Sequence, residues 1–145
     1  MAVAVAELPL PPAQAVALVA DPEQAPRWMT SLVSLRWGHL PPQALDRPFV
    51  VERQLADRTA RWPAQVTAWE PPALLGWRIL QDQLTVERTI RIQATATGSR
   101  VELEEALTAA TGVARLALPW FRREVRRRLA ADAAALAALA RGAAP

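Results

Sequence analysis

The sequence predicts an α+β domain in which a curved antiparallel sheet of about six to seven strands wraps around a long C-terminal helix. Strong alternation of apolar and polar residues runs over 49–53, 85–92 and 100–104, which is typical of half-buried strands. After Gly112 the apolar residues recur every three or four positions, which is the period of an amphipathic helix. Two short helices are expected after the first strand.

Length and composition limit the class of protein. The chain of 145 residues is long enough for a substantial core, and we expect a single domain over 1–145. No apolar run approaches the ~18 residues of a membrane span, so stable membrane insertion is not expected. Residues 1–7 lack a basic start and alternate like a strand, which favours folded chain over a signal peptide.

Charge and cysteine content exclude some kinds of site and partner. The chain has no Cys, which excludes disulfides and Cys-ligated metals, and a cytoplasmic protein is the simplest inference. All 17 basic residues are Arg, but the net charge is only +3. Nucleic acid usually needs a concentrated basic face, so we expect no nucleic-acid partner.

The first elements follow from alternation, prolines and a capping residue. Residues 2–8 are predicted to form the first strand. Residues 11–20 are predicted to form a short helix with proline in its first turn, where a missing N–H costs little. Asp21 is expected to cap a second short helix that ends around 26–28.

The middle of the chain is predicted as a second strand at 31–37, a loop at 38–46 and then four hairpins. Two-residue turns are expected at Asp57-Arg58, Pro71-Pro72, Asp82-Gln83 and Thr97-Gly98. These turns place Arg53 opposite Trp62, Val66 opposite Trp77, Trp77 opposite Arg88, and Ile90 opposite Glu105. Each hairpin keeps its apolar residues on one face, which supports the register. Arg78 and Glu87 become an outward cross-strand pair.

The C-terminal helix is predicted from roughly Ala114 to Arg141. Its apolar stripe comprises Leu118, Phe121, Val125, Leu129, Ala133, Leu136 and Ala140. Pro119 is expected in the first turn or at a kink. The five arginines within 122–128 would attract an anionic membrane or RNA, but Glu124 interrupts them and they spread around the helix. A solvated face is therefore expected there. Asp132, at the edge of the stripe, could face the far end of the cavity, but a solvated position is expected for it as well.

Several segments, in their order along the chain, resemble one superfamily. Residues 11–16 and 21–28 are similar to its opening helices, 66–72 to its strand-turn signature, and 98–103 to its last hairpin. The chain resembles the START-like (SRPBCC) superfamily, and within it the polyketide cyclase/dehydrase and lipid-transport group. The resemblance spans almost the whole chain and implies a helix-grip fold with a cavity between sheet and helix. Members of the superfamily bind lipids, sterols, polyketides or quinones, and some catalyse cyclisation or dehydration.

The candidate site is the inner face of the sheet together with the apolar side of the long helix. The expected ligand-binding residues are Trp37, Arg53, Trp62, Trp77, Ile79, Arg88, Ile90, Glu105, Phe121, Val125 and Leu129. Arg88 interrupts an inward apolar set, and a buried charge without a partner is very costly, so pairing with Glu105 is expected. The pair would orient a polar group of the ligand, or alternatively would be purely structural. We expect Arg88→Ala to weaken binding and to leave the fold intact.

Three functions stay open at this level. The first is a non-catalytic binding or carrier protein for a small, mostly apolar ligand such as a lipid, a quinone or a polyketide-like molecule. The second is a cyclase or dehydratase in which Arg88 polarises a carbonyl and Glu105, its pKa raised by burial, moves protons. The resemblance implies a pocket with a mix of Arg, Tyr, His and Ser or Thr for a cyclase, so the absence of Tyr from this chain counts against the activity. The third is a protein-interaction module without a ligand.

Other candidate sites are weak. His39, the only histidine, falls in a predicted loop, no zinc or phosphate-loop spacing is present, and neither a metal nor a cofactor is expected. No catalytic residue is identified. Trp69 is predicted on the outer face of the sheet, and an exposed Trp69 or Trp120 would indicate a contact surface, which leaves a homodimer open.

Overall fold

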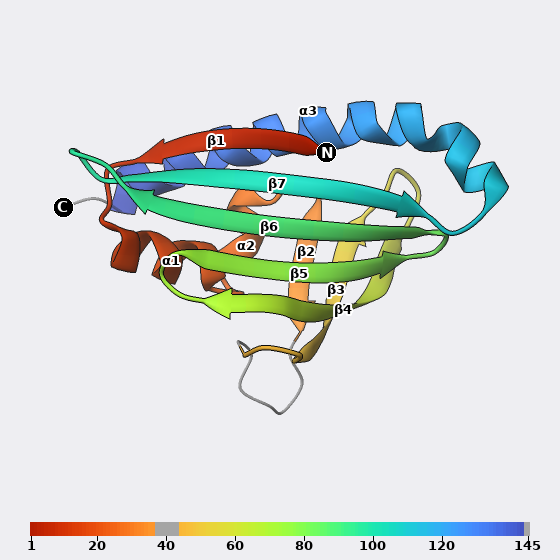
Figure 1. Cartoon of the computed structure of the whole chain (residues 1–145), viewed down its shortest axis with the longest axis horizontal. Coiled ribbons are helices and arrows are strands. Elements are labelled where there is room, and N and C mark those ends of the chain that lie inside the picture. Colours follow the sequence, from red (N-terminus) through yellow and green to blue (C-terminus); the bar gives the residue numbers. More distant parts are fainter. Residues whose placement is uncertain (37–43, 144–145) are drawn as a thin grey trace.

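The computed structural model describes residues 1–36 and 44–143, and it has the predicted helix-grip architecture. The elements, in chain order, are β1 (Ala2–Leu8), α1 (Pro12–Ala20), α2 (Ala25–Trp28), β2 (Leu32–Arg36), β3 (Pro48–Gln54), β4 (Thr59–Glu70), β5 (Leu74–Gln81), β6 (Leu84–Ala94), β7 (Ser99–Ala109) and α3 (Gly112–Ala143). Figure 1 shows α3 running along the curved sheet, with α1 and α2 toward the end where α3 finishes.

The described strands form one antiparallel sheet of seven strands in the order β1-β7-β6-β5-β4-β3-β2. The first strand therefore pairs with the last, and β2 and β3 close the opposite side. The core lies between the inner face of this sheet and the buried stripe of α3. The predicted stripe is confirmed from Val125 to Ala140, all of whose predicted positions are buried.

Two of the four predicted hairpin registers are confirmed. Trp77 lies opposite both Val66 and Arg88, as predicted from the turns on either side of β5. The exposed pair Arg78–Glu87 also forms, with 2.9 Å between guanidinium nitrogen and carboxylate oxygen. Between β5 and β6 the turn lies where the sequence places it. Between β4 and β5 the loop has three residues, 71–73, and a bulge in β4 restores the predicted pairing of Val66 with Trp77.

The other two registers were wrong by two residues. Arg53 lies opposite Ala60 and not Trp62, and Arg88, not Ile90, lies opposite Glu105. In both hairpins a four-residue loop replaces the assumed two-residue turn. The Leu55 N–H donates to the Arg58 carbonyl across one loop, and the Thr95 N–H donates to the Gly98 carbonyl across the other. A two-residue slip leaves every side chain on its original face, so the apolar pattern could not reveal it.

The prediction for Trp69 was also wrong. The register shifts between Val66 and Ala68, so β4 carries a bulge, and Trp69 then lies opposite the buried Leu75. An extra residue in one strand exchanges the two faces beyond it. Trp69 therefore packs on the inner side of the sheet, against the core.

The first residues of α2 and α3 both differ from the predicted helix starts. The Asp21 carboxylate accepts the Glu23 N–H at 2.9 Å, and the Asp21 carbonyl accepts the N–H of Ala25. Asp21 thus closes a separate turn, and α2 begins only after it. At the other end of the chain, the Thr111 hydroxyl accepts the Ala114 N–H at 3.2 Å and caps α3, which begins at Gly112.

Pro119 lies inside α3 and not in its first turn. Proline has no N–H to donate and its ring crowds the preceding turn, so it bends a helix. Figure 1 shows the first turns of α3 bent away from the axis of the rest and extending past the ends of the neighbouring strands.

Candidate functional site

Five charged side chains meet between the sheet and α3, and we call them the arginine cluster: Arg53, Arg88, Glu105, Arg128 and Asp132. Arg88 donates to Glu105 at 2.7 Å and to Asp132 at 3.3 Å. Arg128 donates to the other oxygen of Glu105 at 2.5 Å. The predicted pair of Arg88 and Glu105 is thus confirmed as an ion pair, and both side chains are buried.

The arginine cluster also binds the corner between α2 and β2. The Asp132 carboxylate accepts the backbone N–H of Thr30 at 2.7 Å, and Arg53 donates to the carbonyl of the same residue at 2.8 Å. Ser31, next in the chain, has a positive φ of 62°. Both the N–H and the carbonyl of Thr30 are thus hydrogen-bonded to the arginine cluster. Through these bonds the cluster connects β3, β6, β7 and α3 to this corner.

The charges of the arginine cluster do not balance. It contains three guanidinium groups and two carboxylates, which leaves one positive charge in excess. Three buried N–H groups of these arginines have no partner among the described residues, namely Arg53 Nε, Arg88 Nη1 and Arg128 Nε. Buried donors without acceptors are uncommon in native proteins, so the cluster has room for an acceptor such as a water molecule or an oxygen of a ligand.

The pKa shifts follow from the same geometry. Burial alone would raise the pKa of Glu105, but Arg88 and Arg128 outweigh it, so its pKa lies below the usual range. Burial also opposes the charge of Arg88, yet Glu105 and Asp132 outweigh it and raise its pKa. Arg53 differs, because burial together with Arg128 and Arg88 lowers its pKa to about 9. Arg53 is therefore the positive charge that the folded protein accommodates least well.

The lowered pKa of Glu105 predicts a loss of stability in acid. A carboxylate whose folded-state pKa is depressed stabilises the fold above its unfolded pKa of about 4.3, and this contribution is lost as the pH falls through the folded value. We expect the free energy of unfolding, from urea titrations between neutral and acidic pH, to fall in acid. Glu105→Gln should be less stable at neutral pH and should lose less on acidification. An equal acid loss in both proteins would contradict this role.

Two members of the arginine cluster were missed at the sequence level. Asp132 was expected to be solvated but is fully buried, and Arg128 was grouped with the exposed arginines. A signal existed, because Asp132 lies three residues after Leu129 and four before Leu136, within the apolar stripe. Arg128 lies four residues before Asp132 and so shares its side of the helix.

A groove borders the N-terminal half of α3, and we call it the α3 groove. It has a volume of about 430 Å³, and its lining is mostly apolar: Leu55, Trp62, Gln81, Asp82, Gln83, Leu84, Val113, Ala114, Ala117 and Phe121. Small-molecule sites commonly have volumes of ~300–1,000 Å³ with apolar walls and a few polar groups. Of the expected ligand-binding residues, Trp62 and Phe121 line it.

Trp62 links the α3 groove to the arginine cluster. Because Arg53 lies opposite Ala60 on β4, it is diagonal to Trp62, which is two residues further along. Diagonal neighbours on one face of a sheet lie about 7–8 Å apart, within reach of long side chains. On the helix, Phe121 precedes Arg128 by two turns, about 10.5 Å along the axis. The arginine cluster therefore adjoins the groove on the sheet, through Arg53 and Trp62, and lies two turns further along α3 on the helix side.

A second crevice opens between β1, β7 and α3 and has a volume of about 210 Å³. Its lining is polar in part: Met1, Ala2, Glu105, Ala106, Leu107, Arg122, Val125 and Arg126. Two expected ligand-binding residues, Glu105 and Val125, meet here. Glu105 thus lines this crevice and also belongs to the arginine cluster, through its contacts with Arg88 and Arg128.

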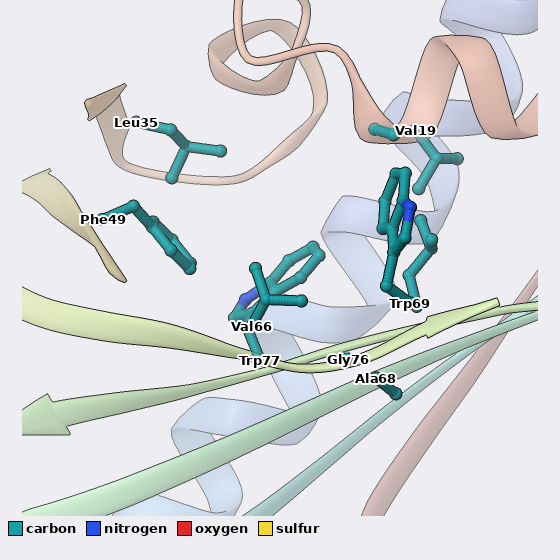
Figure 2. Close-up of a pocket in the computed structure, with 10 residues that line it drawn as sticks. Val19, Leu35, Phe49, Val66, Ala68, Trp69, Gly76 and Trp77 are labelled. Carbon is teal, nitrogen blue, oxygen red and sulfur yellow. The ribbon is translucent and has the colours of Figure 1, made fainter. Parts of the chain in front are cut away.

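A third, small crevice is lined by Trp69 of β4 and Trp77 of β5 (Figure 2). Figure 2 shows Trp69 beside Val19, with Phe49 and Leu35 across the space and Trp77 between them. The ring of Phe49 meets that of Trp77 edge-on, with centroids 6.4 Å apart. The crevice has a volume of about 20 Å³, which is enough for about one water molecule and too small for an organic ligand.

The other expected site residues fall into the packed core. Ile79, Ile90 and Leu129 are buried in the main core cluster. Trp37 and His39 lie outside the described residues. Residues 1–36 and 44–143 contain no group of three or more His, Cys, Asp or Glu side chains that could hold a metal ion. Within the same residues, no helix combines the length and the apolarity that a bilayer crossing requires.

Comparisons with known proteins identify the family and agree with the fold. The family described as "Polyketide cyclase / dehydrase and lipid transport" matches residues 2–141. No curated protein matches the sequence. Among solved structures, TTHA0849 from Thermus thermophilus is similar over 99% of both chains, with 14% identity and a TM-score of 0.78. NE0264 from Nitrosomonas europaea is similar over 98% of this chain and 94% of its own, with 13% identity and a TM-score of 0.73.

A third similar structure is the di-domain ARO/CYC StfQ from the steffimycin biosynthetic pathway. The similarity covers 97% of this chain and 50% of StfQ, with 12% identity and a TM-score of 0.76. At these identities the three structures establish the fold alone.

Proposed function

Because the chain belongs to the polyketide cyclase/dehydrase and lipid-transport family, we propose that it binds and carries a small, mostly apolar molecule that has one acidic oxygen-bearing end. The apolar body would occupy the α3 groove, and the acidic end would point toward the arginine cluster. The observation that carries the proposal is the excess positive charge of this cluster, with its three unpaired N–H groups, beside an apolar groove.

A contribution to stability does not explain why an arginine stands at position 53. Its pKa of about 9 reflects a charge that folding disfavours, since burial and the two neighbouring arginines all oppose it. A guanidinium holds its proton at neutral pH, so this cost is not relieved by deprotonation. Groups whose environment opposes their charge concentrate at functional sites, where a ligand of opposite charge can offset the cost.

The cyclase alternative is less well supported. It requires Glu105 to exchange a proton near neutral pH, with a pKa raised by burial. Arg88 and Arg128 instead bring that pKa below the usual range, so the carboxylate stays ionised. StfQ is described as an ARO/CYC, but similarity at 12% identity does not transfer an activity.

The α3 groove can be tested by filling it. Ala117 lies in the wall of the groove, so Ala117→Trp should place an indole in the space of the ligand. We expect the affinity for decanoate, measured by isothermal titration calorimetry, to fall at least tenfold, about 1.4 kcal/mol. The matched control is Ala134→Trp, because Ala134 is exposed on the same helix. Equal affinities in the two variants would show that the groove is not the site.

A further inference from the structure

Three large apolar side chains on the first turns of α3 face solvent. Val113 is 76% exposed, Leu116 is 84% exposed and Trp120 is 60% exposed. Their spacing of three and four residues places them on one line along the helix. Scattered single apolar residues are ordinary at a surface, but an aligned set of this size indicates a contact.

The same line continues into arginines. Arg123 and Arg127 follow Trp120 at the same spacing of three and four residues. Arg122 and Arg126 line a surface hollow together with Arg123. In the described part of the chain, Arg115, Arg122, Arg123 and Arg126 take part in no ion pair, whereas Arg127 pairs with Glu124. The surface therefore combines an apolar tip with a basic flank.

This surface lies at the mouth of the α3 groove. Val113 lines the groove, and the ring of Trp120 packs edge-on against Phe121 in the groove wall, with centroids 5.1 Å apart. Figure 1 shows these first turns of α3 extending past the ends of the strands, away from the body of the sheet. A flat partner could therefore reach the apolar tip without contacting the rest of the fold.

We propose that this face of α3 docks on the surface of an anionic bilayer. Trp and aliphatic side chains with flanking arginines have the composition of interfacial helices, in which the apolar side enters the headgroup boundary and the cations meet anionic lipid. A second copy of the chain fits less well. Residues 112–128 contain six arginines and one glutamate, so a symmetric contact would place arginine against arginine.

The docking surface adjoins the ligand site but extends beyond it, and its use rests on the proposed function. A bilayer held at the mouth of the groove would exchange an apolar ligand with the protein without passing it through water. The test must therefore separate docking from ligand binding, and the chain allows this because Leu116 and Trp120 are outside the groove lining.

The experiment is co-sedimentation of the purified protein with vesicles of phosphatidylcholine alone or mixed with phosphatidylserine. We expect binding only to the mixed vesicles, weakening as salt is added. The double variant Leu116→Ser/Trp120→Ser and the charge reversal Arg123→Glu/Arg126→Glu should each bind at least tenfold more weakly. The control Leu80→Ser, at an exposed leucine on the sheet, should bind like the original protein.

Three results would overturn the proposal. They are no binding to the mixed vesicles at low salt, equal binding by the double variant, and a dimer in sedimentation velocity that Trp120→Ser dissociates. The last result would assign the face to a second copy. Decanoate titration of the double variant separates the two claims, because retained decanoate binding with lost vesicle binding supports docking. Absence of decanoate binding in every variant, with vesicle binding intact, would overturn only the proposed function.

Discussion

Replacing Arg88 with methionine is expected to lower the free energy of unfolding by about 3–5 kcal/mol, because it leaves Glu105 and Asp132 buried with one cation fewer. Removal of one partner from a buried ion pair costs far more than the pair contributes, since the remaining charge stays desolvated. Urea denaturation at neutral pH measures the loss directly.

The matched control for this substitution is Arg78→Met. Arg78 also pairs with a carboxylate on the next strand, but both partners are about half exposed. Exposed pairs contribute up to about 1 kcal/mol, so this variant should be close to the original protein. If Arg88→Met and Arg78→Met lost equal stability, the arginine cluster would not be the buried network described above.

The same reasoning corrects an expectation from the sequence. Arg88→Ala was expected to weaken binding and to leave the fold intact, but a residue that neutralises two buried carboxylates is not a clean probe of binding. A loss of affinity in that variant would be inseparable from a loss of structure.

Arg53 offers the cleaner probe, and its replacement by methionine is expected to stabilise the protein while weakening ligand binding. Its pKa is lowered to about 9, so the cost of its charge is fully present at pH values below about 9. Methionine removes that cost and keeps an unbranched apolar side chain in place of the arginine stem. The lost hydrogen bond to the Thr30 carbonyl, worth about 1 kcal/mol, offsets part of the gain.

We expect Arg53→Met to raise the free energy of unfolding by about 1–2 kcal/mol and to weaken decanoate binding at least tenfold. Urea denaturation and calorimetry of one preparation give both numbers. A variant that is less stable than the original would contradict the account of an excess charge. Unchanged affinity would show that Arg53 has no part in binding.

Much of the fold was predictable because the relevant signals are local. Alternation over 85–92 and 100–104 identified β6 and β7, and the stripe from Val125 to Ala140 identified the buried side of α3. Loop length was not predictable in this way. A four-residue loop in place of a two-residue turn changes which residues face each other but not which face they occupy.

The site was predictable only in part. The ion pair of Arg88 and Glu105 could be expected from an arginine among inward apolar residues, because such a charge needs a partner. The contribution of Asp132 depends on how β2, β6 and α3 converge, which no local pattern contains. Trp69 was misplaced because a bulge leaves little trace in the sequence. Groove volume depends on sheet curvature and on the bend of α3 at Pro119.

The central claim is that an apolar acid binds beside Trp62 with its acid directed to the arginine cluster. The most direct test is calorimetric titration of the protein with decanoic acid and, separately, with its methyl ester. The account predicts one acid molecule bound per chain and at least tenfold weaker binding of the ester, because the ester brings no charge to offset Arg53. Equal affinities for acid and ester, or binding of neither, would contradict it.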